Sequence, residues 1–349
     1  MPLTLYVDGD RWRSHLRAVR DAHPGIVPVA KGNGYGFGLP RLAEEAAALE
    51  VDTLAVGTYA EVEPVSAFPG SVMVLSPWRP FEDAVYGDHV VHTVGRLSDL
   101  GQLTARADRP RVVLERMTSM RRHGFSAREL RAAALAAQEQ GGVTVEGVAV
   151  HLPMAGHGSA SGHLAEMERL MTDVVAAGLA TRRVYVSHLT DSELTTLSGR
   201  YPDYELRPRI GTSLWLGDRG ALAVRSTVLD VHPVERGDVF GYRGRTVPKT
   251  GHILVVAGGT AHGIGLEAPT GGSTLRDRAV RLAQGGMDAA GFVRSPFTVG
   301  GKQRLFAEPP HMQASMLFLP YGAPVPAVGD EVDVRVRYTT ATFDRTAVS

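Results

Sequence analysis

The chain has 349 residues, of which 44% are hydrophobic and 21% are charged, so it is long enough for a large core and for more than one domain. Lysine plus arginine and aspartate plus glutamate both number 37, and this zero net charge excludes a general electrostatic attraction to nucleic acid or to membrane surfaces. The sequence contains no cysteine, which excludes disulfide bonds and thiolate catalysis.

The N-terminal segment, MPLTLYVDGDRW, lacks the basic stretch followed by an apolar run that is typical of a signal peptide. No apolar run in the sequence reaches the length of a membrane-spanning helix. We therefore expect a soluble, cytoplasmic protein that binds neither membranes nor nucleic acid, and we expect no metal ion at its functional site.

Up to about residue 222, short runs rich in β-branched residues alternate with stretches rich in Ala, Leu, Glu and Arg. The expected strands are Ile26–Ala30, Thr53–Val56, Ser71–Leu75, His89–Thr93, Arg111–Glu115, Val145–His151, Arg183–Ser187 and Leu206–Ile210. The clearest helices are Leu39–Leu49, Ala127–Gln140 and Gly162–Ala177. Successive βα units of similar size favour a closed (β/α)8 TIM barrel over the competing doubly wound open sheet.

After Leu222 the pattern changes to strands separated by turn residues, with little helix. We expect residues 1–222 to form the barrel, with the first few residues as candidates for pairing with a second domain. Residues 223–349 are expected to form this all-β domain, which contains a helical insertion near residues 274–291 (Thr274–Gly291).

The stretch Val29–Gly38, VAKGNGYGFG, places a lysine where a buried strand meets a glycine-rich loop. At the C-terminal end of a barrel strand, Lys31 would be partly desolvated, which lowers a lysine pKa and allows a Schiff base to form. The glycines would let a cofactor approach the backbone, and Tyr35 could reach a phosphate. The alternative is a surface lysine followed by a flexible loop.

This stretch resembles the lysine motif of the alanine racemases, which are barrel-type enzymes that use pyridoxal 5'-phosphate (PLP). The resemblance implies that Lys31 binds PLP covalently and acts as one of two catalytic bases, and that Tyr35 contacts the cofactor phosphate. Gly32 and Gly34 stand where the family usually has alanines. The resemblance also implies a homodimer whose active sites are shared between subunits.

Two further segments resemble the family in the same order along the chain. In RVVLERMTSMRRHGF, Arg122 matches the arginine that contacts the phenolic oxygen of PLP and the substrate carboxylate. Glu115 stands where the family often has a carbamylated lysine, and its negative charge would hold Arg122 without modification. A solvated charge pair is the alternative. In VEGVAVHLPMAG, His151 matches the histidine that packs on the pyridine ring, although a lone strand-end histidine is more often structural.

The segments VSHLTDSELTTL and RPRIGTSLWLG resemble the rest of the family's cofactor site. Ser192, Gly211 and Thr212 match phosphate-binding positions, and Ser192 also lies near an expected helix start. Asp191 replaces an asparagine, and because its charge would repel a phosphate we expect it to point away. Arg209 matches the arginine at the pyridine nitrogen. It cannot accept the ring proton, which favours racemisation over the decarboxylases of similar fold, which use an acidic residue there.

The resemblance fails at the second catalytic base, which racemisation needs on the opposite face of the substrate. In VVAGGTAHGIG, Thr260 stands in place of the family's tyrosine, and a threonine hydroxyl has no usable acidity near neutral pH. His262 is the candidate replacement because imidazole titrates in the right range, and His311 is a weaker candidate. A structural loop histidine is the alternative reading of His262.

The sequence therefore predicts a PLP-dependent, amino-acid racemase-like isomerase that acts on a small amino acid, alanine by default. Its expected catalytic residues are Lys31, His262 and Arg122, and its expected cofactor-binding residues are Lys31, Tyr35, Arg122, His151, Ser192, Arg209, Gly211 and Thr212. The alternatives are a one-face PLP enzyme, such as a lyase, decarboxylase or epimerase, and a binding protein that lost turnover, with or without PLP.

Overall fold

The computed structural model describes residues 2–154, 161–266 and 293–349. They form two compact units, one of residues 14–217 and the other of residues 1–13 together with 218–349. The expected helical insertion Thr274–Gly291 lies outside the described residues.

The unit of residues 14–217 is a closed barrel of parallel strands. Its 8-stranded sheet runs in the order β2-β9-β8-β7-β6-β5-β4-β3, and a parallel bridge between Val29 and Ala55 joins the two ends of this order. The strands are β2 (Val27–Pro28), β3 (Thr53–Val56), β4 (Ser71–Pro77), β5 (Val90–Val94), β6 (Arg111–Arg116), β7 (Thr144–Val150), β8 (Arg183–Val186) and β9 (Glu205–Ile210). The barrel expected from the sequence is thereby confirmed, and an open sheet is excluded.

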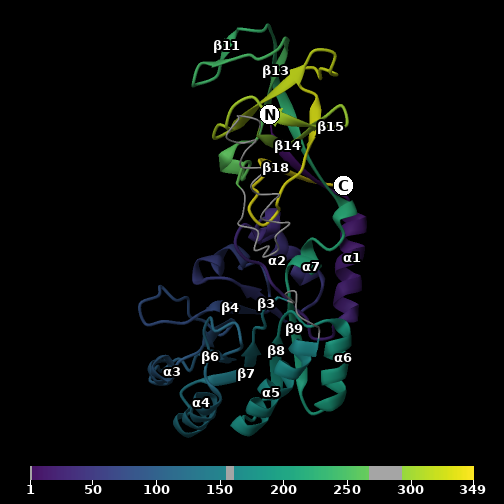
Figure 1. Ribbon diagram of the computed structural model, residues 1–349. Helices are drawn as coiled ribbons and strands as arrows, with labels where there is room; N and C mark the ends of the chain where they lie inside the picture. Colours follow the sequence, from purple (N-terminus) through teal and green to yellow (C-terminus); the bar gives the residue numbers. More distant parts are fainter. Residues whose placement is uncertain (1, 155–160, 267–292) are drawn as a thin grey trace. The chain divides into compact units, whose positions relative to one another are not determined.

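Helices pack on the outside of these strands, as Figure 1 shows for α3 to α6. The helices are α1 (Gly9–Ala22), α2 (Leu39–Ala48), α3 (Leu97–Thr104), α4 (Ala127–Gln140), α5 (Ser161–Ala177), α6 (Asp191–Arg200) and the short α7 (Thr212–Trp215). Local sequence fixes their ends. Helix α4, for example, begins after a capping box of Ser126 and Glu129 and ends at Gly141, which has a left-handed φ of 62°.

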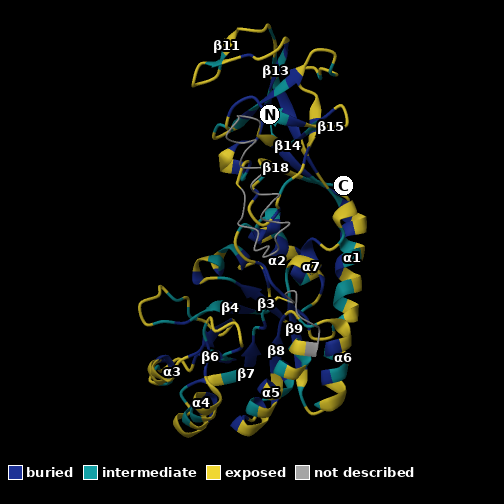
Figure 2. Ribbon diagram, in the orientation of Figure 1, coloured by how far each residue is buried: buried dark blue, intermediate teal, exposed yellow. Residues whose placement is uncertain are grey.

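Side chains from β2 to β8 and from the residue after β2 fill the middle of the barrel. Its central cluster consists of Val27, Val29, Ala55, Met73, Val91, Val113, Ala149 and Tyr185. These residues are buried, and Figure 2 shows that exposure is concentrated on the outer faces of the helices. Each residue of this cluster lies within one of the short runs that predict the strands.

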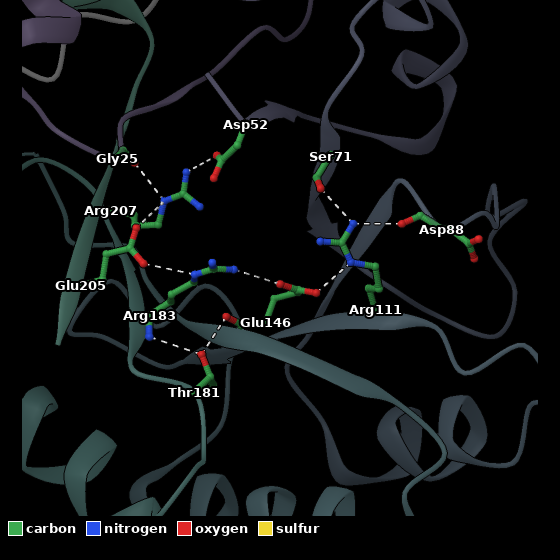
Figure 3. Close-up of polar contacts among 10 residues, drawn as sticks. All are labelled: Gly25, Asp52, Ser71, Asp88, Arg111, Glu146, Thr181, Arg183, Glu205 and Arg207. Carbon is green, nitrogen blue, oxygen red and sulfur yellow. Dashed lines mark hydrogen bonds and ion pairs between the residues drawn. The ribbon is translucent and has the colours of Figure 1, made fainter. Parts of the chain in front are cut away.

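Charged residues near the amino ends of the strands form a floor network, which consists of Arg111, Glu146, Arg183, Glu205 and Arg207 (Figure 3). Positive and negative side chains alternate from β6 to β9. Glu146 lies 2.7 Å from Arg111 and 3.3 Å from Arg183. Glu205 lies 3.1 Å from Arg183 and 3.6 Å from Arg207. Arg207 also pairs with Asp52 and donates to the Gly25 carbonyl. Each charge of the network meets an opposite charge, so these ion pairs link the amino ends of four neighbouring strands.

The other unit is a mostly antiparallel β structure. Its sheet runs in the order β13-β16-β15-β14-β17-β10-β1-β18, with a further pairing of β13 and β10. The first strand of the chain, β1, pairs antiparallel with β10 and parallel with β18, so both ends of the chain join this unit. The strands are β1 (Leu3–Val7), β10 (Leu222–Val234), β11 (Val239–Phe240), β12 (Arg245–Thr246), β13 (Gly251–Ala257), β14 (Arg294–Val299), β15 (Lys302–Phe306), β16 (Ala314–Pro320), β17 (Glu331–Val334) and β18 (Arg345–Val348).

Short 3-10 turns complete the description: η1 (Gly34–Gly36), η2 (Tyr59–Glu61), η3 (Glu63–Val65), η4 (Arg219–Ala221) and η5 (Thr260–His262). Among the helices in the described parts of the chain, none combines the length and the apolar character that crossing a bilayer requires.

Candidate functional site

A cavity of about 360 Å³ lies at the carboxyl ends of the barrel strands. Its lining comes from the ends of β2, β3, β4, β6, β7 and β9, and it comprises Lys31, Gly57, Thr58, Leu75, Ser76, Pro77, Glu115, Arg122, His123, His151 and Arg209. The carboxyl ends of parallel strands meet at one end of a barrel, which is why residues far apart in sequence gather here. Four of the expected site residues, Lys31, Arg122, His151 and Arg209, therefore line one cavity.

Lys31 follows β2 and begins a tight loop that contains η1. Gly34 has a left-handed φ of 61°, and a Cβ there would fall 2.7 Å from the backbone nitrogen of Leu39. Tyr35 itself has a φ of 55°, an uncommon conformation for a residue with a large side chain. The loop therefore needs glycine at position 34, where the resemblance expects alanine, and it turns the buried Tyr35 toward β9.

The environment of Lys31 makes its amine easier to deprotonate. Partial burial in the cavity lowers the pKa of Lys31, and the charges of Arg122 and Arg209 act in the same direction, while Glu61 opposes them. A lowered pKa increases the fraction of neutral, nucleophilic amine at a given pH. Lys31 thus combines an accessible side chain with the electrostatics required for attack on a carbonyl group.

Arg209 lies buried on β9 with an unfilled hydrogen-bonding position. One terminal nitrogen, Nη2, donates to the Val150 carbonyl at 3.1 Å, but Nε has no hydrogen-bond partner among the described residues. Burial lowers the pKa of Arg209 and the nearby Glu115 raises it, and arginine stays charged in proteins. An unsatisfied charged donor that is buried at a cavity wall is suited to an acceptor atom of a bound molecule.

Glu115, expected to hold Arg122, lies beside His123 in the structure. Its carboxylate is buried and lies 3.4 Å from Nε2 of His123, while Arg122 is exposed at the cavity mouth. The negative charge is present at the expected place, and it also acts on the buried Arg209. Arg122 is accessible for a carboxylate from solution, which arginine binds in bidentate geometry.

His151 is held in its neutral form beside these cations. Its Nδ1 lies 2.9 Å from the Ser187 hydroxyl, and its ring meets that of His188 edge to face at a centroid distance of 5.1 Å. Burial, followed by the charges of Arg209 and Arg122, lowers the pKa of His151 to about 3. A neutral, oriented imidazole is a flat surface for ring packing and a poor proton donor near neutral pH.

Tyr35, Gly211 and Thr212 meet at the start of α7. Burial raises the pKa of the Tyr35 hydroxyl to about 12, and a hydrogen bond with the Thr212 side chain opposes this change. A Cβ at Gly211 would collide with that hydroxyl, so glycine is required for this approach. The phenol, the threonine hydroxyl and the backbone of this turn together offer polar groups that could bind a phosphate.

Ser192 lies in the first turn of α6. It is exposed, its hydroxyl lies 3.2 Å from that of Thr190, and it is not among the described residues that line the Lys31 cavity. The neighbouring Asp191 is exposed and lies 3.0 Å from Nε2 of His23. This contact directs the carboxylate toward α1, in keeping with the expectation that Asp191 points away from a bound anion.

Glu61 is a residue that the sequence does not single out. From the η2 turn, Oε1 of its carboxylate accepts a hydrogen bond from the Gly32 N–H at 2.8 Å, and Oε2 accepts one from the Gly57 N–H at 2.6 Å. These bonds tie the loop after β2 to the loop after β3, on either side of Lys31. The capping pattern of Thr58 and Glu61 is visible in the sequence, but it does not reveal the bond to Gly32.

We expect Glu61→Gln to weaken retention of a Lys31-bound cofactor by about 10- to 100-fold. The amide offers one acceptor oxygen in place of two, and loss of a charge-assisted hydrogen bond costs about 1.5–3 kcal/mol. Titration of the cofactor-free protein, followed by absorbance, measures the effect. Glu63→Gln, at an exposed carboxylate two residues further along, is the matched control. Equal retention by both variants would contradict the positioning role of Glu61.

Thr260, which stands in place of the family's tyrosine, and His262, the candidate second base, lie in the C-terminal unit. Thr260 is exposed, and its N–H donates to the His311 carbonyl at 2.8 Å. His262 is buried: Nδ1 accepts from the Gly259 N–H at 3.2 Å, and Nε2 lies 3.1 Å from Oδ1 of Asp344. An imidazole with both nitrogens engaged inside the protein has no free position for a substrate proton, which differs from the expected catalytic role of His262.

Comparison with known proteins supports the assignment of the fold. The profile of the family described as "Alanine racemase, N-terminal domain" matches residues 7–217. An alanine racemase of Salinispora tropica is 29% identical over an alignment of 290 residues, and the match covers 76% of this chain and 77% of that protein. The family profile covers every residue that lines the Lys31 cavity.

Solved structures resemble the whole chain at lower identity. Alanine racemase from the D-cycloserine-producing Streptomyces lavendulae has a TM-score of 0.71 and 22% identity, with coverage of 100% of this chain and 97% of that one. Alanine racemase from Bartonella henselae, solved with covalently bound pyridoxal phosphate, has a TM-score of 0.70 and 16% identity, with coverage of 96% and 91%. At these identities the likeness concerns the fold, a barrel followed by a β domain. Because the family profile spans more than half of the sequence and includes every strand of the barrel, this chain belongs to the alanine racemase family.

Proposed function

We propose that this chain is a PLP-dependent amino-acid racemase that acts on a small amino acid, with alanine as the first substrate to test. The observation that carries the proposal is the cavity in which Lys31, whose pKa is lowered, lies with Arg122, His151 and Arg209 at the carboxyl ends of the barrel strands.

The residues present fit PLP. The amine of Lys31 is suited to hold its aldehyde carbon, and the unsatisfied Nε of the buried Arg209 is suited to its ring nitrogen. The neutral His151 offers a surface for ring packing. For the phosphate we propose Tyr35, the Gly211–Thr212 backbone and Ser192, of which the exposed Ser192 would have to reach the anion from the start of α6.

The chemistry that bound PLP would supply is electron withdrawal from the substrate, which would make the hydrogen on Cα acidic. Arg122 then binds the substrate carboxylate, which fixes the orientation of Cα. Lys31 removes or returns a proton on one face of Cα. Arg209, which remains a cation, would leave the ring nitrogen unprotonated and so would moderate the electron withdrawal by the bound cofactor.

We propose further that the enzyme is a cytoplasmic homodimer in which the C-terminal unit of one subunit completes the active site of the other. Two acid/base groups are required on opposite faces of the substrate, and Lys31 supplies one. The barrel cavity also contains His151, whose pKa of about 3 makes it unsuitable as the second group.

A one-face PLP enzyme is the second candidate, because Thr260 has no usable acidity and both nitrogens of His262 are engaged. Incubation of the PLP-loaded protein with L-alanine and with D-alanine separately in D2O discriminates the two functions. We expect each enantiomer to give both enantiomers with deuterium at Cα, measured by NMR and chiral chromatography. Exchange without inversion would establish the one-face enzyme instead. Retained PLP with no exchange from a panel of small amino acids would leave a binding protein.

A further inference from the structure

The C-terminal unit contains its own cavity, of about 700 Å³, on the side that carries Thr260. Its polar lining consists of Tyr242, Arg243, Thr260, Glu308, His311 and Gln313. Within this lining, Glu308 and His311 form a carboxylate–imidazole pair, with Oε1 of Glu308 2.6 Å from Nε2 of His311. The function proposed above gives this pair no role.

Glu308 is a fixed and buried acceptor. Its side chain is 2% exposed, and Oε2 accepts a hydrogen bond from the Tyr242 N–H at 3.1 Å. Gly241 allows this approach, because a Cβ there would collide with the carboxylate. An ionised carboxylate only accepts hydrogen bonds, so the neutral imidazole of His311 carries its proton on Nε2. Its Nδ1 has no hydrogen-bond partner among residues 2–154, 161–266 and 293–349 and is the basic nitrogen.

The His311 ring is also held in place. Its centroid lies 4.6 Å from that of Tyr242 at an interplanar angle of 52°. The main chain of His311 is bonded on both sides, since its N–H donates to the Ala314 carbonyl at 2.9 Å and its carbonyl accepts from Thr260. Pro309 and Pro310, whose φ angles are restricted, separate the pair in sequence. The imidazole is 28% exposed and therefore reachable from the cavity.

We propose that His311, oriented by Glu308, is the second acid/base group of the racemase, acting on the face of the substrate opposite to Lys31. This inference rests on the proposed function and on the shared site proposed with it. In many enzymes a neighbouring group fixes the tautomer and orientation of the imidazole that acts as a base, and Glu308 has this position beside His311. The adjacent Thr260 is the position at which the family resemblance expects the tyrosine.

The proton balance is as follows. Nδ1 of His311 takes the α-hydrogen of one enantiomer as a proton, and the electron pair of the broken Cα–H bond stays with the substrate and its bound cofactor. The protonated amine of Lys31 then gives a proton to the other face, and the same electron pair forms the new Cα–H bond. The imidazolium next to Glu308 returns its proton to solvent, and Lys31 regains one. In the reverse direction the two groups exchange roles.

The decisive variant is His311→Gln, whose side-chain amide keeps a donor for Glu308 but cannot carry a proton. We expect racemisation to fall by about 10²- to 10⁴-fold, the usual contribution of an acid/base group. Exchange of the α-hydrogen for deuterium should be lost for one enantiomer of alanine and retained for the other. Absorbance of the Lys31-bound cofactor should not change. His232→Gln is the matched control, because His232 also faces a carboxylate, Asp230 at 3.4 Å, but lies outside the cavity.

Two measurements test the role of Glu308 as a positioning residue. In the cofactor-free protein, nitrogen NMR of labelled histidine should show His311 as the Nε2–H tautomer, with this preference lost in Glu308→Gln. In the loaded enzyme, Glu308→Gln should lower kcat with little change in KM, and Glu308→Asp, which keeps the carboxylate, should recover part of the loss.

Racemisation by His311→Gln within about threefold of the wild-type rate would overturn the assignment, since a lost acid/base group costs far more. A single-enantiomer defect in His123→Leu, with normal His311→Gln, would assign the role to the imidazole paired with Glu115 in the barrel instead. A different result would contradict the proposed function itself. If the PLP-loaded wild-type protein exchanges the α-hydrogen of neither enantiomer, both the proposed function and this inference fail.

Discussion

Replacing Lys31 with alanine is expected to abolish both covalent cofactor binding and racemisation. The amine is the attachment point and one of the two acid/base groups, so turnover should fall by about 10⁴-fold or more. The side chain is exposed at the cavity and contributes little to the barrel core, so the variant should fold. Reduction of the loaded protein with borohydride, followed by peptide mass spectrometry, should place the cofactor mass on Lys31 in the wild-type protein alone.

The chain is well suited to this experiment because Lys31, Lys249 and Lys302 are its only lysines. The latter two are exposed in the C-terminal unit, and Lys249→Ala is the matched control. It should keep both the visible absorbance of the bound cofactor and full racemisation. Cofactor mass on Lys249 or Lys302, or an unchanged absorption spectrum in Lys31→Ala, would remove the basis of the proposed function.

Replacing Arg209 with glutamate is expected to lower racemisation by about 10²- to 10³-fold, the usual cost of losing a preorganised hydrogen-bond donor in an active site. A carboxylate at the ring nitrogen would keep that nitrogen protonated and make the cofactor a stronger electron sink. The longer-lived carbanion should then be protonated at the wrong atom, so that a 2-oxo acid appears as a side product. Chiral chromatography measures the racemisation, and an enzyme-coupled assay measures the oxo acid.

Arg209→Lys is the control for charge, because it keeps a cation and should produce little oxo acid. Arg209 is buried near Glu115, so the glutamate variant brings two carboxylates close together, and thermal unfolding must be followed in parallel. A folded Arg209→Glu protein that racemises at the normal rate without oxo acid would show that this side chain does not govern the cofactor ring.

The barrel and much of its cavity could be predicted from the sequence because both depend on local patterns. Each run of β-branched residues forms a strand, and the strands bring Lys31, His151 and Arg209 together at their carboxyl ends. The order of strands in the C-terminal unit could not be predicted in this way. It depends on pairings such as that of β1 with β18, which join the two ends of the chain.

The role of His262 shows why proximity in sequence is a weak guide within a turn. It lies two residues after Thr260, but the η5 turn directs its ring inward to Asp344, far along the chain. Conversely, His311 is distant from Thr260 in sequence and adjacent to it through the backbone. Glu61 was missed for the same reason, since its partner Gly32 belongs to another βα unit. Such long-range contacts leave no periodic signal in the sequence.

The residues of the floor network, which join the strands of the barrel, are separate from the residues that line the cavity. Its alternating charges join strand beginnings, whereas the lysine, arginines and histidine of the cavity stand at strand endings. Substitutions at the carboxyl ends of the strands can therefore change or abolish the reaction while the ion pairs at the amino ends stay intact. Such an arrangement lets the functional end of the barrel change while the ion pairs at its other end continue to join the strands.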